Sequence, residues 1–251
     1  MGQLNQKIAI VTGAAGGFGE GIAKAYVAEG AKVIVADLNA RAAQRVAAEL
    51  GAQASPFTCD VSNAVQVQAL VAHCVKTFGI PHIVVNNAGT THKNQPMLGV
   101  DEATFDRVFA VNVKSIFHMT HAVLPLLRER GTGGVILNIG STAGIRPRPG
   151  LSWYNASKGA VNILSKSMAV ELGPEKIRVN AICPVMGVTG LFELFMGLPD
   201  TPENRAKFQA TIPIGRFSEP KDVAAAAVFL ASDAAEFFTG VEFPVDGGRT
   251  I

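Results

Sequence analysis

The chain has 251 residues, 48% of them hydrophobic and 17% charged, which is enough apolar material for a sizeable core and argues against disorder. Its 22 basic and 20 acidic side chains leave a formal net charge of only +2, so charge gives no reason to expect a nucleic acid or an anionic membrane surface as partner. No apolar run approaches the ~18 residues needed to cross a bilayer, so a membrane-spanning protein is not expected.

Strand-like and helix-like segments alternate along the chain. In order, we predict a strand over 7–11, a helix from Phe18 to Gly30, a strand over 32–36, a helix over 40–50, a strand over 54–58, a helix over 64–78, a strand over 82–85, a helix over 105–130 that Pro125 kinks, a strand over 133–140, a helix over 152–172, a strand over 177–182, a helix over 222–231 and a strand over 241–245. This alternation predicts one α/β domain, 1–251, with a doubly wound parallel sheet.

The segment 184–215 is expected to be irregular, because it contains four prolines and is too long for an ordinary connection. We interpret it as a substrate lid. Its apolar part, 190–200, either covers an apolar substrate or packs against its own domain or another subunit.

The stretch "TGAAGGFG" (12–19) follows the first predicted strand and precedes the first helix. Glycines between a strand and a helix let the backbone approach the pyrophosphate of a dinucleotide, which then lies at the helix N-terminus. Gly13, Gly17 and Gly19 have the spacing G-x-x-x-G-x-G rather than G-x-G-x-x-G. A glycine-rich turn without a ligand is the alternative.

Asp37 ends the second predicted strand, 20 residues after Gly17, where an acid can accept hydrogen bonds from an adenosine ribose. A carboxylate there repels a 2′-phosphate, and neither Leu38 nor Asn39 supplies a cation. The sequence therefore favours NAD, and Arg41 keeps NADP open as an alternative. Asp37 could instead only cap the next helix.

Tyr154 and Lys158 in "YNASK" lie four residues apart and share one face of a helix. A nearby ammonium is expected to lower the pKa of the tyrosine from its usual value of about 10. Such a tyrosine can exchange a proton with an alcohol or carbonyl oxygen. The pair alone would more often be a surface contact.

Two further polar residues raise the specificity of this pattern. Ser141 follows a predicted strand, at the sheet edge where ligands of α/β proteins bind, and can donate to a reacting oxygen. Asn112 lies in an apolar helical stretch and needs a partner for its amide, so a purely structural role is its alternative.

Seven short motifs occur in order along the chain: "TGAAGGFG" (12–19), "CDV" (59–61), "NNAG" (86–89), "VNV" (111–113), "NIGSTAG" (138–144), "YNASK" (154–158) and "VDGG" (245–248). Together they resemble the short-chain dehydrogenase/reductase family over essentially the whole chain. The resemblance implies a single Rossmann-type domain with about seven parallel strands and helices on both faces. It also implies an NAD(P)-dependent oxidoreductase that forms homotetramers or, less often, dimers.

The resemblance assigns roles to individual residues. Tyr154 would be the general acid and base, Lys158 would lower its pKa and hold the nicotinamide ribose, Ser141 would position the substrate oxygen, and Asn112 would hold a helix kink and a water of a proton relay. The expected cofactor contacts are Thr12, Gly13, Gly16, Gly17, Phe18, Gly19, Asp37, Leu38, Asp60, Val61, Asn87, Ala88, Gly89, Tyr154, Lys158, Pro184, Val185 and Thr189. Val185 departs from the family pattern, which commonly has glycine after this proline.

The predicted reaction moves a hydride between nicotinamide and a secondary alcohol or ketone. NADPH-dependent reduction of 3-oxoacyl thioesters on an acyl carrier protein is the alternative, which Asp37 disfavours. Arg128, Arg130, Arg146 and Arg148 could meet such an acidic carrier or form only a solvated face. A non-catalytic dinucleotide sensor is a third, weaker interpretation.

The remaining polar residues give smaller expectations. The five histidines show no ligand spacing, so no catalytic metal is predicted, and His92 and Trp153 are expected near the substrate. Cys59, Cys74 and Cys183 fit neither a zinc site nor a disulfide framework, which favours a reducing, cytoplasmic location.

Overall fold

Residues 2–187 and 192–251 are described by a computed structural model. Within them seven strands form one parallel sheet in the order β3-β2-β1-β4-β5-β6-β7. The strands are β1 (Ile8–Thr12), β2 (Lys32–Asp37), β3 (Ala54–Thr58), β4 (Ile83–Asn86), β5 (Gly134–Ile139), β6 (Ile177–Pro184) and β7 (Glu242–Val245). The predicted doubly wound sheet is confirmed.

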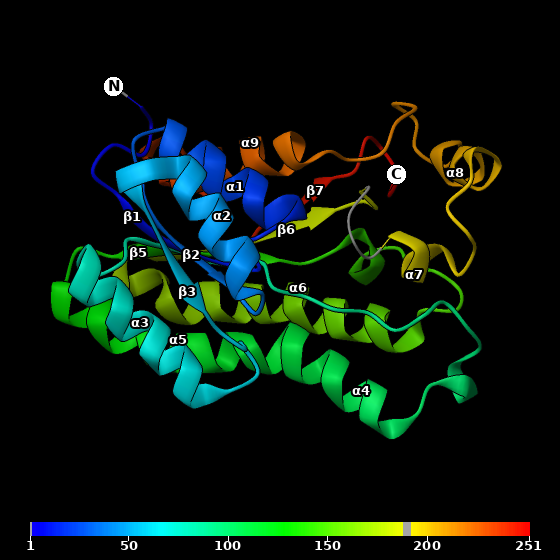
Figure 1. Cartoon of the computed structure of the whole chain (residues 1–251), viewed down its shortest axis with the longest axis horizontal. Coiled ribbons are helices and arrows are strands. Elements are labelled where there is room, and N and C mark those ends of the chain that lie inside the picture. Colours follow the sequence, from blue (N-terminus) through cyan, green and yellow to red (C-terminus); the bar gives the residue numbers. More distant parts are fainter. Residues whose placement is uncertain (1, 188–191) are drawn as a thin grey trace.

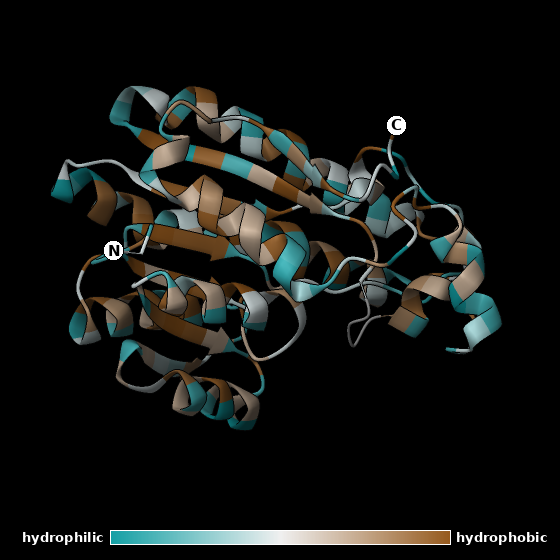
Figure 2. Ribbon diagram, turned by 90° about the horizontal axis from the view of Figure 1, so that it is seen from above, coloured by the Kyte–Doolittle hydropathy of each residue, from teal (hydrophilic) through white to brown (hydrophobic). Residues whose placement is uncertain are grey.

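Helices cover both faces of this sheet (Figure 1). One layer consists of α1 (Gly17–Ala28), α2 (Ala40–Leu50) and α9 (Pro220–Ala231), and the other of α3 (Ala64–Thr77), α5 (Ser115–Arg130) and α6 (Ser152–Leu172). Strand side chains alternate between the two layers: Ala9 and Val11 pack beneath the first, and Ile10 beneath the second. Burial on both faces explains why inner strands such as β1 and β4 are almost entirely apolar. Strands that are brown along most of their length are visible in the middle of the sheet in Figure 2.

The strand order reverses between β1 and β4, which pair with each other in the middle of the sheet. The chain leaves β1 toward β2 on one side and leaves β4 toward β5 on the other. The loops therefore diverge at the carboxyl edge of these two strands, and ligands of open α/β sheets bind at such a point.

The predicted helix over 105–130 is not continuous. It consists of α4 (Glu102–Phe109), a π-helical segment (Ala110–Lys114) and α5, and Pro125 lies inside α5 without ending it. The interruption is explained by a side-chain contact. The amide of Asn112, in the π-helical segment, is hydrogen-bonded to the backbone of Thr90 in the loop after β4. Such π segments are often found at functional sites.

The segment 184–215 is more regular than predicted. It contains α7 (Phe192–Met196) and α8 (Pro202–Gln209). Phe192 and Met196 are buried in a small cluster with Val185, Ile212 and Phe217. Part of the apolar stretch 190–200 therefore packs against its own domain. This is one of the two interpretations given for it, the other being that it covers an apolar substrate.

Candidate active site

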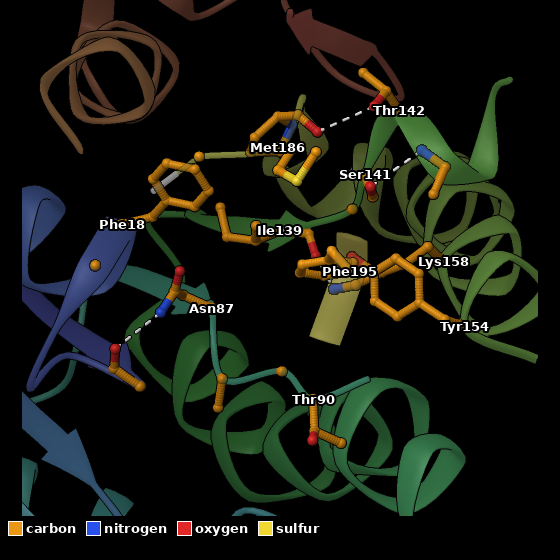
Figure 3. A pocket seen from close by; sticks show the side chains of 18 of the residues that line it. Phe18, Asn87, Thr90, Ile139, Ser141, Thr142, Tyr154, Lys158, Met186 and Phe195 are labelled. Carbon is orange, nitrogen blue, oxygen red and sulfur yellow. Dashed lines mark hydrogen bonds between the residues drawn. The ribbon is translucent and has the colours of Figure 1, made fainter. Parts of the chain in front are cut away.

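A cavity of about 780 Å³ opens at the carboxyl edge of the sheet, where the loops after β1 and β4 diverge. Its walls come from the loops after β1, β2, β3, β4, β5 and β6, from the start of α6, and from α7, α8 and the residues after β7. Figure 3 shows Phe18 and Asn87 on one side of this cavity and Ser141, Tyr154, Lys158 and Phe195 on the other.

The glycines of the first turn have different surroundings. Gly13 and Gly17 have positive φ angles of 62° and 54°. A Cβ on Gly13 would lie 2.9 Å from the Cα of Ala88, and one on Gly19 would collide with the carbonyl oxygen of Gly13. Around Gly16, in contrast, a Cβ would meet nothing within 4 Å, so the N-terminus of α1 faces open space. This is the backbone arrangement that a pyrophosphate requires.

Thr12 and Asn87 hold this turn against the loop after β4. The hydroxyl of Thr12 accepts hydrogen bonds from the backbone N–H groups of Asn87 (3.0 Å) and Ala88 (3.1 Å). The Asn87 amide donates to the carbonyl oxygens of Thr12 (2.8 Å) and Gly13 (3.0 Å). Thr12 is buried away from the cavity, so its contribution is to position the turn.

Asp37 faces the same cavity at the end of β2. Its carboxylate accepts hydrogen bonds from the backbone N–H groups of Ala15 (3.0 Å) and Asn39 (2.9 Å). The side chain that caps α2 is that of Asn39, which accepts from the N–H of Ala42. The simple capping role for Asp37 is therefore wrong.

Asn112 lies behind the cavity wall. Its amide oxygen accepts from the N–H of Thr90 (2.8 Å), and its amide nitrogen donates to the carbonyl of Thr90 and the hydroxyl of Ser157 (both 2.9 Å). A Cβ on Gly89 would lie 3.4 Å from the Asn112 oxygen and 3.5 Å from Nζ of Lys158. Asn112 thus joins the loop after β4 to α6, close to Lys158.

Ser141, Tyr154 and Lys158 meet because the loop after β5 packs closely on α6. A Cβ on Gly144 would lie 2.8 Å from the backbone nitrogen of Gly159, so only glycine permits this approach. The ring of Phe195 in α7 lies edge-on against the ring of Tyr154, with 5.0 Å between centroids. Nζ of Lys158 donates to the carbonyl oxygen of Ile139 (2.7 Å).

Burial is the main cause of the pKa shifts of Tyr154 and Lys158. It raises the pKa of Tyr154 to about 12, although the hydrogen bond with Ser141 and the positive charge of Arg148 lower it in part. The same burial lowers the pKa of Lys158 to about 8. The expected lowering of the tyrosine pKa by Lys158 is not found: the groups that lower this pKa are Ser141 and Arg148, and removal from water outweighs both.

Replacing Lys158 with methionine is expected to stabilise the protein at pH 7 by up to about 3 kcal/mol, because it removes a buried cation whose pKa is lowered from 10.5 to about 8, at about 1.4 kcal/mol per pKa unit. The pKa of Lys158 is depressed in the folded state, so the protonated amine destabilises the fold fully below pH 8. The gain should shrink between pH 8 and the ordinary lysine pKa of 10.5. Urea denaturation of Lys158→Met and the unmodified protein at pH 7 and near pH 10 measures this gain. If Lys158→Met is less stable than the unmodified protein at pH 7, the buried amine does not destabilise the fold.

Most of the residues predicted for the site line the cavity. Those that do are Gly13, Gly16, Gly17, Phe18, Asp37, Leu38, Asp60, Val61, Asn87, Ala88, Gly89, Ser141, Tyr154, Lys158, Pro184 and Val185. Thr12, Gly19 and Asn112 lie behind its wall, and Thr189 lies outside the described residues. Val185 continues the strand pairing, with its N–H bonded to the carbonyl of Val245 (3.1 Å), so this position does not need glycine.

Several lining residues were not predicted individually. Met186, Phe195 and Phe208 reach the cavity from the segment 184–215 that was predicted as a lid, and Arg249 directly follows the motif "VDGG". Trp153 and His92, in contrast, do not line it: the indole of Trp153 donates to the carbonyl of Met97 and packs against Phe105.

The four arginines considered together in the sequence separate in space. Arg128 pairs with Glu175 (2.7 and 2.8 Å) and Arg130 donates to the carbonyls of Ile80 and Pro81, just before β4 and so at the amino edge of the sheet. Only Arg146 and Arg148 lie at the cavity. The set cannot form one docking face for a carrier protein.

The part of the chain that the structure describes has neither a metal-ligand cluster nor a membrane-spanning helix. Residues 2–187 and 192–251 contain no group of three or more His, Cys, Asp or Glu side chains arranged to hold a metal ion. Among the helices in those ranges, none has the length and apolar character needed to cross a bilayer.

Residues 13–250 match a family model described as "Enoyl-(Acyl carrier protein) reductase". The chain is 50% identical over 251 residues to 4-formylbenzenesulfonate dehydrogenase of Comamonas testosteroni, covering 99% of both chains. It is 40% identical to 2-(S)-hydroxypropyl-CoM dehydrogenase 3 of Xanthobacter autotrophicus, covering 99% of this chain and 98% of the relative. The structure superposes, with a TM-score of 0.94, on 3-ketoacyl-(acyl-carrier-protein) reductase from Brucella melitensis complexed with NADH, which is 45% identical; the match covers 99% of this chain and all of that one.

Proposed function

The chain belongs to the short-chain dehydrogenase/reductase family and is an oxidoreductase of CH–OH groups, and from this premise we propose that it moves a hydride between NAD(H) and a secondary alcohol or its ketone. The observation that carries the proposal is one cavity that holds both halves of the chemistry. A glycine turn at a helix N-terminus lies at one end, and Ser141, Tyr154 and Lys158 lie at the other.

The residues present fit a nicotinamide dinucleotide. Gly16 leaves space for the pyrophosphate at the N-terminus of α1, and Asp37 offers a carboxylate to the adenosine ribose. Asp60 and Val61 would lie by the adenine and Lys158 by the nicotinamide ribose. When bound, the nicotinamide supplies the hydride donor or acceptor. The preference for NAD over NADP rests on Asp37 and on a structural relative whose complex contains NADH.

Tyr154 exchanges the proton of the substrate oxygen. With its pKa raised to about 12, the phenol is neutral at pH 7 and can donate to the oxygen of a ketone as that oxygen gains charge. Ser141 stabilises the same oxygen by a hydrogen bond, and Lys158 and Arg148 add positive charge near the phenol. Asn112 positions the loop of Gly89 and Thr90 against α6.

Because the phenol of Tyr154 must lose or gain a proton, alcohol oxidation and ketone reduction should depend on pH in opposite ways. Alcohol oxidation needs Tyr154 to accept a proton, so its kcat/KM should rise as pH increases toward the pKa of the phenol. Ketone reduction needs the protonated phenol and should be fastest below that pKa. Initial rates in both directions between pH 6 and 10 test this, and parallel profiles would contradict the role of Tyr154.

Two more parts of the proposal concern the surroundings of the site. We propose that α7 and α8 act as the substrate lid, since Phe195 packs on Tyr154 and Phe208 on Arg148.

We also propose that the protein is a homotetramer, as the family resemblance implies. We propose a cytoplasmic location, because the three cysteines are buried and unpaired, which fits a reducing compartment.

The competing functions have less support. NADPH-dependent reduction of 3-oxoacyl groups on an acyl carrier protein is the activity named for the structural relative, but Asp37 disfavours NADPH and two of the four arginines lie far from the cavity. A sensor would not need Asn112, Ser141, Tyr154 and Lys158 packed together.

The proposal is tested by incubating the protein with NAD⁺ and a panel of secondary alcohols, sugar alcohols and 3-hydroxyacyl thioesters, and measuring the absorbance of reduced nicotinamide. We expect reduction of NAD⁺ with at least one simple alcohol. Turnover confined to 3-oxoacyl or 3-hydroxyacyl thioesters with NADP(H) would establish the alternative.

A further inference from the structure

Three arginines gather at the substrate end of the cavity. Arg146 and Arg148 come from the loop between β5 and α6, and Arg249 follows β7. Nη1 of Arg146 donates to the carbonyl oxygen of Arg249 (3.0 Å), which fixes the two segments against each other.

These guanidinium groups have no acidic partner within the described ranges 2–187 and 192–251. The ion pairs found there join other residues, and no carboxylate lies within 4.0 Å of Arg146, Arg148 or Arg249. The two acidic side chains that line the cavity, Asp37 and Asp60, follow β2 and β3, on the far side of the sheet centre. The two carboxylates therefore lie away from Arg146, Arg148 and Arg249, although two other cations, Arg107 and Lys158, also line the cavity.

Arg148 is partly buried, whereas Arg146 is exposed. Its guanidinium lies over the ring of Phe208, 4.7 Å from the centroid, and its Nη1 is 3.9 Å from the sulfur of Met186. Neither contact offsets the cost of removing the positive charge of Arg148 from water as a paired carboxylate would. Burial and the charge of Arg249 lower the pKa of Arg148, which shows that its charge is poorly matched by the protein itself. An anion bound there would relieve both effects.

We propose that the substrate carries an organic acid group, a sulfonate or a carboxylate, which Arg148 binds with the support of Arg146 and Arg249 while the alcohol or ketone oxygen lies at Tyr154. This inference rests on the proposed function, because it places the acid group relative to the reacting oxygen. Arg148 lines the same cavity as Tyr154 and lies near enough for its charge to lower the pKa of the phenol. Leu151 and Phe195 provide the apolar wall for the carbon skeleton between the two ends.

The test uses two ketones that differ only in charge, 4-acetylbenzenesulfonate and the neutral 4-acetylbenzenesulfonamide. Each is titrated by calorimetry into the protein saturated with NAD⁺, a mixture in which a ketone cannot be reduced. We expect the sulfonate to bind about tenfold or more tightly than the sulfonamide, as a hydrogen bond to a charged group allows. Equal binding, or no binding of the sulfonate at millimolar concentration, overturns the proposal.

Variants assign the preference to Arg148. Arg148→Met keeps an apolar stem against Phe208 and should lose the preference for the sulfonate, and Arg148→Lys should retain part of it. Arg128→Met is the matched control, because it removes an arginine from the opposite edge of the sheet and should keep the full preference. A preference that persists in Arg148→Met contradicts the assignment.

The same titrations separate this inference from its competitors. If Arg148→Met weakens NAD⁺ binding as much as it weakens sulfonate binding, the arginines serve the phosphates of the cofactor and the proposal fails. If neutral alcohols reduce NAD⁺ at rates equal to those of their acidic counterparts, the acid group has no role while the proposed oxidoreductase function stands.

Discussion

Replacing Tyr154 with phenylalanine is expected to lower kcat by about 10²- to 10⁴-fold, the range that a positioned general acid or base contributes. The change removes one hydroxyl and keeps the ring, so the edge-on contact with Phe195 should survive. The dissociation constant of NADH should remain nearly unchanged, because the proposed contribution of the phenol is to proton transfer. Steady-state kinetics on a confirmed substrate and calorimetry with NADH measure the two quantities.

Tyr26 is the matched control, since it is the only other tyrosine in the chain. Its hydroxyl donates to the carbonyl oxygen of Ala227 (3.1 Å) in the core between α1 and α9, far from the cavity. Tyr26→Phe should lower the free energy of unfolding by about 1 kcal/mol and leave kcat unchanged. Full activity in Tyr154→Phe would show that another group transfers the proton.

The double variant Asp37→Ser, Leu38→Arg is expected to reverse the cofactor preference from NADH to NADPH. It removes the carboxylate that repels a 2′-phosphate and adds a cation at an exposed position beside it, where Leu38 is 70% exposed. Each change should shift the ratio of the two dissociation constants by about tenfold or more. Serine keeps an oxygen that can accept the N–H groups of Ala15 and Asn39, so the glycine turn should remain in place.

The single variants separate the two effects. Leu38→Arg alone should improve NADPH binding only in part, because Asp37 still repels the phosphate. Asp37→Ser alone should weaken NADH binding, because the ribose loses its acceptor. If the double variant binds the two cofactors with the ratio of the unmodified protein, Asp37 does not contact the ribose and the assignment of this end of the cavity is wrong.

The fold could be predicted because its signals are local. Strands such as β1 and β2 are buried on both faces and are therefore unbroken apolar runs, and glycines follow several of the helices. The family resemblance implies a kink at Asn112, but the helical periodicity over 105–130 gives no sign of it, because the break depends on Asn112 bonding to Thr90, 22 residues earlier in the chain. The pattern of apolar residues along the helix gives no information about that contact.

The site was predicted less completely, for the same reason. The motif residues were identified from their order, but the role of Asn87 in holding the glycine turn depends on contacts 75 residues apart in sequence. The arginine cluster joins residues 103 apart, Arg146 and Arg249. The direction of the Tyr154 pKa was predicted wrongly, because its burial depends on surroundings that the four-residue spacing to Lys158 does not contain.

The most direct test of the account is a parallel calorimetric titration of the unmodified protein with NADH and NADPH. It needs no knowledge of the substrate and reports on the glycine turn and Asp37 together. We expect both measurements to fit one site per chain, with NADH bound at least about tenfold more tightly, a difference of about 1.4 kcal/mol. Tighter binding of NADPH would contradict the role of Asp37, and no binding of either cofactor would contradict the dinucleotide site itself.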